Sequence, residues 1–383
     1  MVGKENCAIY LRREGLGLTC RTGFGLLFFL MTKLRWGIIG TGRIAHTFAQ
    51  GVLRSHTGEL AAVASRTKAS AKEFAKKHSI AKFYGSYQEL LDDPNVEVVY
   101  IATPHPQHEE WAVRAAEAKK HILCEKPLGL HHDQAVEMIQ AAWENKVFFM
   151  EAYMYRCHPQ IERMIELIRA GTIGDVRAIR ASFGFAAQYD LESRLFSREL
   201  GGGGILDVGG YCTSMVRLIA GVAQGKAFVE PERLSVFGQI GAESGVDEYA
   251  TALIVFPGEI AATISCGLRL QQENKVRIEG TAGSLTLVDP WTPNVNGGET
   301  DLILERNGQP LETITVTSPP LYALEVDMVG RHIARGDRQA ASPAMSWADT
   351  LGNIRLQDEW RRAMDAPAPF TTARPVAPVP ISE

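Results

Sequence analysis

The 383-residue chain lacks most of the features that mark a specialised class of protein. Its six cysteines are scattered, without a C-x-x-C pair or metal-ligand spacing, so we expect reduced thiols and no bound metal. A formal net charge of −4 excludes the strong field that would hold nucleic acid or an anionic membrane. The chain has no internal repeat, and its length predicts two globular domains.

The most informative stretch that is present runs from Leu34 to Ala45 and reads L-R-W-G-I-I-G-T-G-R-I-A. A short apolar strand ends in Gly40-Thr41-Gly42 and passes directly into a helix. Gly40 allows the tight turn, and Gly42 lets phosphate groups approach the backbone. The free N–H groups at the helix start favour an anion. The pattern predicts a dinucleotide-binding turn, although such glycine turns also occur for purely structural reasons.

The end of the next strand indicates which dinucleotide is bound. The strand Glu59–Ala64 ends at Ser65-Arg66, about 20 residues past the glycines, where an NAD site usually carries an acid for the ribose hydroxyls. Here a hydroxyl and a guanidinium stand in its place, followed by Thr67 and Lys68. These groups suit a 2′-phosphate, which an acid would repel. We therefore expect NADP, and NAD is the less favoured cofactor.

The pattern of the whole chain predicts an α/β domain followed by an α+β domain. Strand-like and helix-like segments alternate from Leu34 to about Tyr153, which is typical of a doubly wound parallel Rossmann sheet. After residue 155, alternating runs joined by short turns predict an open, mainly antiparallel sheet with helices on one face. We expect a dinucleotide-binding domain over 32–154, a substrate and oligomerisation domain over 155–344, a helix over about 345–364 that packs back on the first domain, and a proline-rich tail over 365–383.

The first 31 residues need a separate interpretation. Gly23–Met31 is apolar but too short to span a bilayer, and no small-x-small cleavage site follows Arg12-Arg13 before the first expected strand. The sequence from Met31 onward is typical of the start of a cytosolic dinucleotide-binding protein. We interpret residues 1–31 as a leader that is disordered or not translated, in preference to a targeting signal, and we expect a cytoplasmic protein.

Two polar clusters lie where parallel strands are expected to end, the edge at which such sheets bind ligands. The first is the proline-stiffened loop Thr103–His108, in which His105 and His108 are either ligand-facing or simple loop and helix-start residues. The second is Cys124-Glu125-Lys126-Pro127. A lysine can hydrogen-bond a substrate hydroxyl and lower its pKa, or donate to a carbonyl oxygen. Most lysines are solvated surface charges, but one between a buried strand and a proline is a better candidate for catalysis.

A third cluster is the glycine-rich run Gly201–Tyr211, G-G-G-G-I-L-D-V-G-G-Y. Asp207 and Tyr211 are four residues apart, so on a helical turn they share one face. A tyrosine and a carboxylate that point together at Lys126 form a proton-transfer set suited to a reaction between a carbinol and a carbonyl. The alternative is that Asp207 caps the following helix and Tyr211 packs inside it.

In this order, G-T-G-R-I-A, A-T-P-H-P-Q-H, C-E-K-P and L-D-V-G-G-Y resemble the Gfo/Idh/MocA family of NAD(P)-dependent oxidoreductases over about residues 33–365. The stretches T-P-H-P-Q-H, M-E-A-Y-M-Y-R and G-G-G-G-I-L-D-V-G-G-Y-C are most similar to its branch of trans-1,2-dihydrobenzene-1,2-diol dehydrogenases and NADP-dependent D-xylose dehydrogenases. The resemblance implies Lys126, Asp207 and Tyr211 as catalytic positions, although many relatives have histidine at the last one. It also implies a homodimer or homotetramer assembled through the open face of the second sheet.

The function expected from these observations is NADP-dependent hydride transfer between the nicotinamide and a secondary alcohol or carbonyl of a sugar or cyclic diol. The alternative is a non-catalytic NAD(P)- and sugar-sensing regulator on the same fold. We also assign Arg156 and His158, just after the expected strand Val147–Ala152, to the substrate site. The residues expected to bind the cofactor are Gly40, Thr41, Gly42, Arg43, Ile44, Ser65, Arg66, Thr103, Pro104, His108, Glu125 and Lys126.

Overall fold

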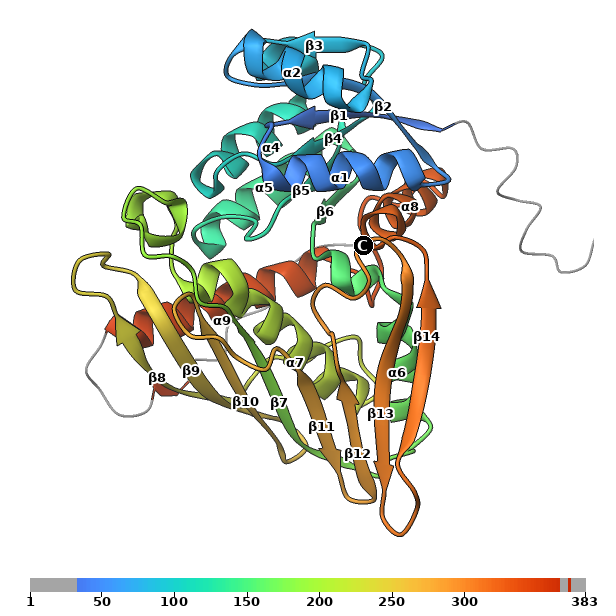
Figure 1. The fold of residues 1–383 in the computed structure, drawn as a ribbon, viewed down its shortest axis with the longest axis vertical. Coiled ribbons are helices and arrows are strands. Elements are labelled where there is room, and N and C mark those ends of the chain that lie inside the picture. Colours follow the sequence, from blue (N-terminus) through green and yellow to red (C-terminus); the bar gives the residue numbers. More distant parts are fainter. Residues whose placement is uncertain (1–32, 366–370, 373–383) are drawn as a thin grey trace, which may run out of the picture. The chain divides into compact units, whose positions relative to one another are not determined.

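The computed structural model describes residues 33–365 and 371–372, which form two β-sheets with helices around them (Figure 1). The leader over residues 1–31 and most of the proline-rich tail lie outside the described residues. The first sheet is parallel and the second is mainly antiparallel. The fold class expected from the sequence is therefore confirmed.

The parallel sheet has the strand order β3-β2-β1-β4-β5-β6, which grows outward from β1 in both directions as in a Rossmann fold. The elements β3 and α3 were not predicted, because three and five residues are too short to show a hydrophobic period. The elements of this part are β1 (Leu34–Ile39), α1 (Arg43–Arg54), β2 (Gly58–Ala64), α2 (Lys68–His78), β3 (Lys82–Tyr84), α3 (Tyr87–Leu91), β4 (Val98–Ile101), α4 (His108–Glu117), β5 (His121–Cys124), α5 (His132–Asn145) and β6 (Phe149–Glu151).

The second sheet has the order β14-β13-β12-β11-β7-β10-β9-β8-β15, and its one parallel pair among the described strands is β7 with β10. Its elements are α6 (Pro159–Arg169), β7 (Val176–Gly184), a π-helical turn (Ile205–Gly209), α7 (Gly210–Val222), β8 (Arg233–Ile240), β9 (Asp247–Phe256), β10 (Ile260–Gly267), β11 (Val276–Gly280), β12 (Gly283–Leu287), β13 (Gly298–Arg306), β14 (Glu312–Ser318), α8 (Leu321–Ala334), α9 (Trp347–Asp365) and β15 (Thr371–Thr372).

Four elements of this second part, β13, β14, α8 and the two-residue β15, were not predicted from the sequence. Most side chains of β14 are exposed or half-buried, so this strand carries little of the apolar alternation that marks a strand. Helix α8 is buried on most sides and therefore lacks an amphipathic period. A periodic signal requires one buried and one exposed face. β14 has almost no buried face and α8 has almost no exposed face, so neither shows the signal.

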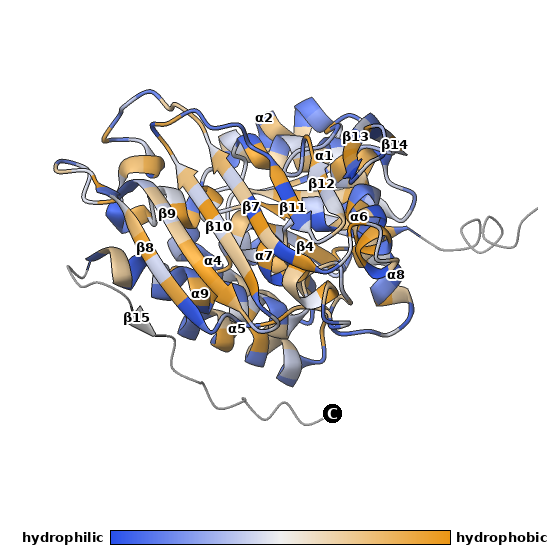
Figure 2. Ribbon diagram, turned by 90° about the horizontal axis from the view of Figure 1, so that it is seen from below, coloured by the Kyte–Doolittle hydropathy of each residue, from blue (hydrophilic) through white to orange (hydrophobic). Residues whose placement is uncertain are grey.

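Two hydrophobic cores cover the two faces of the parallel sheet. On one face, Trp36 and Tyr100 pack with Phe48 of α1, and this core continues into the second sheet. On the other face, Ile39 and Val99 pack with α4, α5 and the first half of α9. Figure 2 shows apolar residues along β9 and β10 of the second sheet, with helices behind them. The parallel sheet is thus buried on both sides, which explains its continuous apolar strands.

Helix α9 contacts both parts of the protein. Trp347 and Ile354 belong to the core shared with α5, whereas Trp360 belongs to the core shared with the second sheet. The described stretch Arg198–Val222, which contains α7, is long and apolar enough to cross a membrane, but its most apolar 18-residue window is buried inside the protein. Its apolar composition is that of a central core helix.

A buried carboxylate of α9 binds α7 and the short 3-10 helix Met154–Cys157 that follows β6. Asp349 of α9 accepts a hydrogen bond from Arg156 at 2.6 Å through Oδ2, and from Arg217 of α7 at 2.5 Å through Oδ1. Both arginine side chains are 0% exposed. Arg217 also donates to Glu230 at 2.7 Å, and Arg156 to the Ser214 carbonyl at 3.1 Å. Asp349 therefore offsets the charge of two guanidinium groups that have no access to water.

We expect Asp349→Ala to lower the free energy of unfolding by about 3–5 kcal/mol, because it leaves two buried arginines without their shared counter-ion. Denaturant unfolding followed by circular dichroism measures the change. Glu199→Ala, which alters an exposed carboxylate, is the matched control and should change the stability by about 0.5 kcal/mol or less. Equal losses in the two variants would contradict the role of Asp349.

Candidate active site

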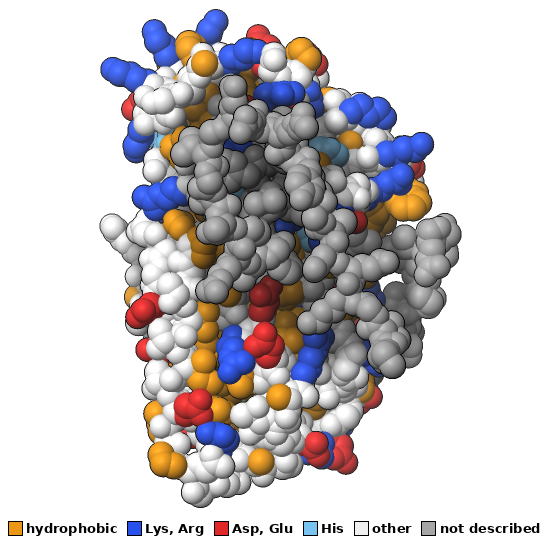
Figure 3. Space-filling model, turned by 90° about the vertical axis from the view of Figure 1, so that its right-hand side faces the viewer, with side chains coloured by type: hydrophobic (Ala, Val, Ile, Leu, Met, Phe, Trp, Pro, Cys, Tyr) orange, Lys and Arg blue, Asp and Glu red, His pale blue; other side chains and the backbone are white. Residues whose placement is uncertain are grey.

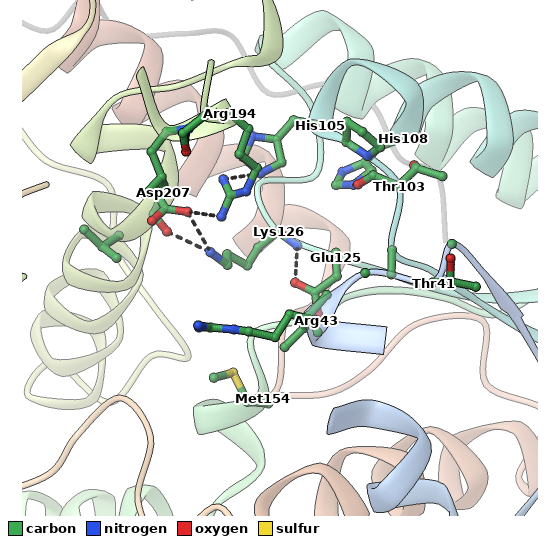
Figure 4. Close-up of a pocket in the computed structure, with 18 of the residues that line it drawn as sticks. Thr41, Arg43, Thr103, His105, His108, Glu125, Lys126, Met154, Arg194 and Asp207 are labelled. Atoms are coloured by element: carbon green, nitrogen blue, oxygen red, sulfur yellow. Dashed lines mark hydrogen bonds and ion pairs between the residues drawn. The ribbon is translucent and has the colours of Figure 1, made fainter. Parts of the chain in front are cut away.

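A cavity of about 970 Å³ lies at the carboxyl ends of the parallel strands β1, β2, β4 and β5. Ligands bind at this edge in doubly wound sheets. The second sheet contributes the end of β7, the segment that follows it and the π-helical turn (Figure 4). The cavity therefore joins the expected dinucleotide turn to the glycine-rich run of the second domain.

The turn after β1 has the geometry that a pyrophosphate requires. Gly40 has a φ of +102°, and a Cβ there would lie 2.6 Å from the Ala102 carbonyl oxygen. Gly42 starts α1, and no side chain caps its first turn. A Cβ on Gly42 would meet nothing within 4 Å, since this position faces the open cavity. The uncapped N–H groups of α1 are thus free to bind an anion.

The end of the cavity beside β2 carries hydroxyl and cationic groups. Thr41 Oγ1 and Ser65 Oγ are 3.1 Å apart in a hydrogen bond, and the Arg66 side chain is exposed beside them. Among the described residues that line the cavity, the acids are Glu125 and Asp207, which lie at its Lys126 end (Figure 4). Thr103 Oγ1 is buried without a hydrogen-bond partner among the described residues. These groups fit a phosphorylated dinucleotide.

At the opposite end, Lys126 and Asp207 meet across the two domains. Lys126 Nζ donates to the backbone carbonyl of Asp207 at 2.8 Å and lies 3.7 Å from its Oδ1. Arg194 donates to the same Oδ1 at 2.9 Å. Burial alone would raise the pKa of Asp207, but the charges of Lys126 and Arg194 outweigh it and lower that pKa. Asp207 is therefore an ionised carboxylate that holds two cations at one point of the cavity.

Tyr211 lines the same cavity but contacts Lys126 with its ring. The Lys126 ammonium lies 5.2 Å from the ring centroid, and the Tyr211 hydroxyl points to Met154 Sδ at 3.6 Å. Burial raises the pKa of Tyr211 well above its ordinary value. The ring packs edge-on against Phe183 at a centroid distance of 5.1 Å. At neutral pH this hydroxyl carries its proton and can donate it.

Glu125 and His108 form hydrogen bonds that hold the loops around Lys126 in place. Glu125 accepts a short hydrogen bond from the Tyr100 hydroxyl, and burial raises the pKa of Glu125 against the opposing charge of Lys126. Both ring nitrogens of His108 lie 2.9 Å from carbonyl oxygens, those of Pro127 and Thr103. His108 thus borders the cavity while its nitrogens are engaged by the backbone. It links the loop after β4 to the loop after β5.

All residues assigned from the sequence to the cofactor or to catalysis line this one cavity. The two residues assigned to the substrate do not, and that assignment was wrong. Arg156 is bound to Asp349 in the core. His158 is 0% exposed, accepts a hydrogen bond from the Gln160 N–H at the start of α6, and bonds Ser318 at 2.8 Å. Their place in the chain, directly after a strand end, gave no sign that the backbone turns inward there.

Several residues of the cavity were not assigned from the sequence. Arg194 and Leu195 belong to a short 3-10 helix (Arg194–Phe196) between β7 and the π-helical turn, in a stretch of sequence that has no motif. Phe183 lies near the end of β7 and Phe185 directly follows that strand; the alternation there indicated a strand but not which face meets the cavity. His105 was considered as ligand-facing or structural, and it lines the cavity while Nδ1 lies 3.2 Å from the Gly201 carbonyl.

The fold and the cavity define a Rossmann-type nucleotide-binding protein with a second domain built on an open sheet. A family model described as an oxidoreductase family with an NAD-binding Rossmann fold matches residues 34–153, and the GFO/IDH/MocA C-terminal domain matches residues 161–286. The chain therefore belongs to the Gfo/Idh/MocA family of oxidoreductases, as its motifs predicted.

Similar proteins cover most of the chain. It is 38% identical to the trans-1,2-dihydrobenzene-1,2-diol dehydrogenase of Bos taurus over 68% of this chain and 76% of that one. The Danio rerio enzyme of the same name is 36% identical over 86% of this chain and 96% of that enzyme. A crystal structure of a 3-ketoreductase from Actinomadura kijaniata with NADP and TDP-benzene has a TM-score of 0.79 at 24% identity. The match covers 87% of this chain and 98% of that chain. This last likeness is one of fold.

Two alanine substitutions separate the roles of the glycines. We expect Gly42→Ala to lower nicotinamide dinucleotide affinity at least about tenfold without changing the melting temperature of the ligand-free protein, because its Cβ enters the open cavity. Gly40→Ala should lower both the dinucleotide affinity and the melting temperature, because Gly40 has a positive φ and its Cβ would meet the Ala102 carbonyl. Fluorescence titration and thermal unfolding measure the two properties. Unchanged affinity in Gly42→Ala would contradict the phosphate-binding turn.

Proposed function

We propose that this protein catalyses NADP-dependent hydride transfer between the nicotinamide and a secondary alcohol or carbonyl carbon of a sugar or cyclic diol. The observation that carries the proposal is the meeting of Lys126, Asp207 and Tyr211 in one cavity with the dinucleotide turn. The name of the relatives at 36–38% identity, trans-1,2-dihydrobenzene-1,2-diol dehydrogenase, supports the same reaction class.

The residues around the cavity suit both halves of this reaction. When bound, NADP supplies or accepts the hydride at its nicotinamide ring. We assign the proton transfer to Lys126 Nζ or to the Tyr211 hydroxyl, which line the same end of the cavity and can donate or accept a proton. Asp207 orients Lys126 through its carbonyl and carboxylate oxygens. The side chains of Phe183, Met154 and Tyr211 give this end of the cavity an apolar lining.

The preference for NADP rests on the end of β2 and its surroundings. Ser65 and Arg66 can bind the 2′-phosphate through a hydroxyl and a bidentate guanidinium. The four lysines of α2, the helix that follows, add positive charge, and Figure 3 shows basic side chains gathered at this end of the described protein. An anionic phosphate is favoured in this field.

We also propose that the protein forms a homodimer or homotetramer through the open face of its second sheet. Phe237 of β8 is 72% exposed and Leu253 of β9 is 48% exposed. The strand register, which pairs Phe237 with Thr251, places both apolar side chains on the same face. Covering them with a second copy is favourable. Sedimentation velocity tests the proposal, and a monomer at every concentration would refute it.

The cofactor preference gives a direct prediction. NADP should bind at least about tenfold more tightly than NAD. Arg66→Ala should lower the NADP affinity about 10- to 100-fold, because it removes a charge-assisted hydrogen bond to the 2′-phosphate. Isothermal titration with both cofactors measures this. Lys72→Ala, an exposed lysine of α2 outside the cavity, is the control and should have a much smaller effect. Equal affinities for NADP and NAD would overturn the preference.

The catalytic assignment predicts that Lys126→Ala and Tyr211→Phe each lower kcat by about 10²–10⁴, the usual effect of losing a positioned proton donor or acceptor. Asp207→Asn should behave like the lysine variant, because Lys126 loses its orienting charge. Tyr211→Phe keeps the ring and should leave cofactor affinity nearly unchanged. The measurement is the absorbance of NADPH during turnover, and Lys76→Ala is the surface control.

The same assay decides between the enzyme and the sensing regulator. A panel of aldoses and cyclic diols is incubated with the protein and NADP, and formation of NADPH is followed. Turnover that is lost in Lys126→Ala supports the proposed function. If the protein binds NADP and the panel compounds but turns none over, the regulator is the better interpretation. Near-full turnover in Tyr211→Phe would leave Lys126 as the proton-transfer residue and make the tyrosine structural.

A further inference from the structure

Arg194 lies in the cavity beside the proposed catalytic group, although no motif predicted it. Its Nη2 donates to Asp207 Oδ1 at 2.9 Å, and Lys126 Nζ lies 3.7 Å from the same oxygen. The Arg194 side chain is 45% exposed, whereas that of Asp207 is 8% exposed. The two cations therefore flank one carboxylate oxygen, and part of the guanidinium remains open to the cavity (Figure 4).

The second contact of Arg194 is longer and indicates which ring nitrogen of His105 carries the proton. Arg194 Nη1 lies 3.5 Å from His105 Nε2, and a guanidinium can only donate, so Nε2 is the acceptor. His105 Nδ1 then carries the proton and donates it to the Gly201 carbonyl at 3.2 Å. Burial lowers the pKa of His105 well below its ordinary value, in agreement with a neutral ring. The long Nη1 contact can be exchanged for a ligand oxygen while the bond to Asp207 stays.

The charges at this end of the cavity indicate a neutral ligand. Lys126 and Arg194 carry two positive charges, and both are already paired with the ionised Asp207, while burial raises the pKa of the neighbouring Glu125. A guanidinium already paired with a carboxylate has little attraction left for an anion, but its remaining N–H groups still bind hydroxyl oxygens. The cavity is also lined by the apolar side chains of Phe183, Phe185 and Leu195. A ring or chain that carries its oxygens on one edge can contact Arg194 and Lys126 with that edge and the apolar side chains with the rest of its surface.

We propose that Arg194 determines substrate specificity by binding a second oxygen on the carbon next to the reacting one. The inference rests on the proposed function, in which Lys126 and Tyr211 act on the reacting oxygen. Because Lys126 and Arg194 meet at one oxygen of Asp207, two adjacent oxygens of a substrate can contact both donors, and Asp207 can accept a hydrogen bond from a substrate hydroxyl. Vicinal diols and α-hydroxycarbonyl compounds are then preferred over isolated alcohols. A site built to bind a substrate hydroxyl rejects analogues that lack it.

The experiment compares two substrates that differ in one hydroxyl. Values of kcat/KM with NADP are measured for trans-cyclohexane-1,2-diol and for cyclohexanol, in the wild type, Arg194→Gln, Arg194→Lys and the control Arg198→Gln. Arg198 lies in the same segment, is exposed and does not line the cavity. We expect a wild-type ratio in favour of the diol of at least about tenfold. Arg194→Gln should lower this ratio at least about tenfold, Arg194→Lys should restore part of it, and Arg198→Gln should leave it unchanged.

The ratio distinguishes specificity from a structural role. If Arg194 only supports Asp207 and the loop, its loss lowers both kcat/KM values together and leaves the ratio unchanged, which would overturn the inference. A wild-type enzyme that oxidises both compounds equally well would also overturn it. Absence of turnover with any alcohol, diol or aldose is a different outcome, because it contradicts the proposed function itself. Thermal unfolding of each variant confirms that the proteins compared are folded.

Discussion

The arrangement of the active site depends on one buried interaction, the binding of Arg156 and Arg217 by Asp349. Arg156 follows the last strand of the parallel sheet, and Arg217 belongs to α7, whose preceding π-helical turn carries Asp207. The carboxylate therefore fixes the start of the second domain relative to the end of the first. Lys126 comes from the parallel sheet, so its 2.8 Å bond to the Asp207 carbonyl requires this alignment. Removing one partner of such a buried ion pair is strongly destabilising, because the other charge is left without compensation.

A second constraint is the balance of charge in the cavity. Asp207 stays ionised although it is buried, because Lys126 and Arg194 both contact it and lower its pKa. The nearby Glu125 differs, since burial raises its pKa and its main partner is the Tyr100 hydroxyl. One carboxyl group holds the cations in place, and the other braces the loop that presents Lys126. The two acids of the cavity thus perform different tasks for electrostatic reasons.

Much of the site was predicted from the sequence because its residues follow strand ends. Gly40, Ser65, Thr103 and Lys126 each come just after a parallel strand, and the carboxyl ends of such strands meet at one edge of the sheet. Asp207 and Tyr211 were found through their glycine-rich run. Arg194 could not be found in this way, since its segment has neither period nor motif. Arg156 and His158 also follow a strand, yet the chain turns into the core at that point and buries them.

The sequence by itself determined the elements with a regular signal: the glycine turn, the amphipathic helices and the alternating strands, together with the family they indicate. These properties are local, because a period or a turn needs only neighbouring residues. The tertiary structure decided which groups face one another across the domains. The meeting of Lys126, Asp207 and Arg194, the burial of Arg156 against Asp349, and the ring contact of Tyr211 with Lys126 join residues far apart in the chain. Their geometry depends on packing, which no local pattern encodes.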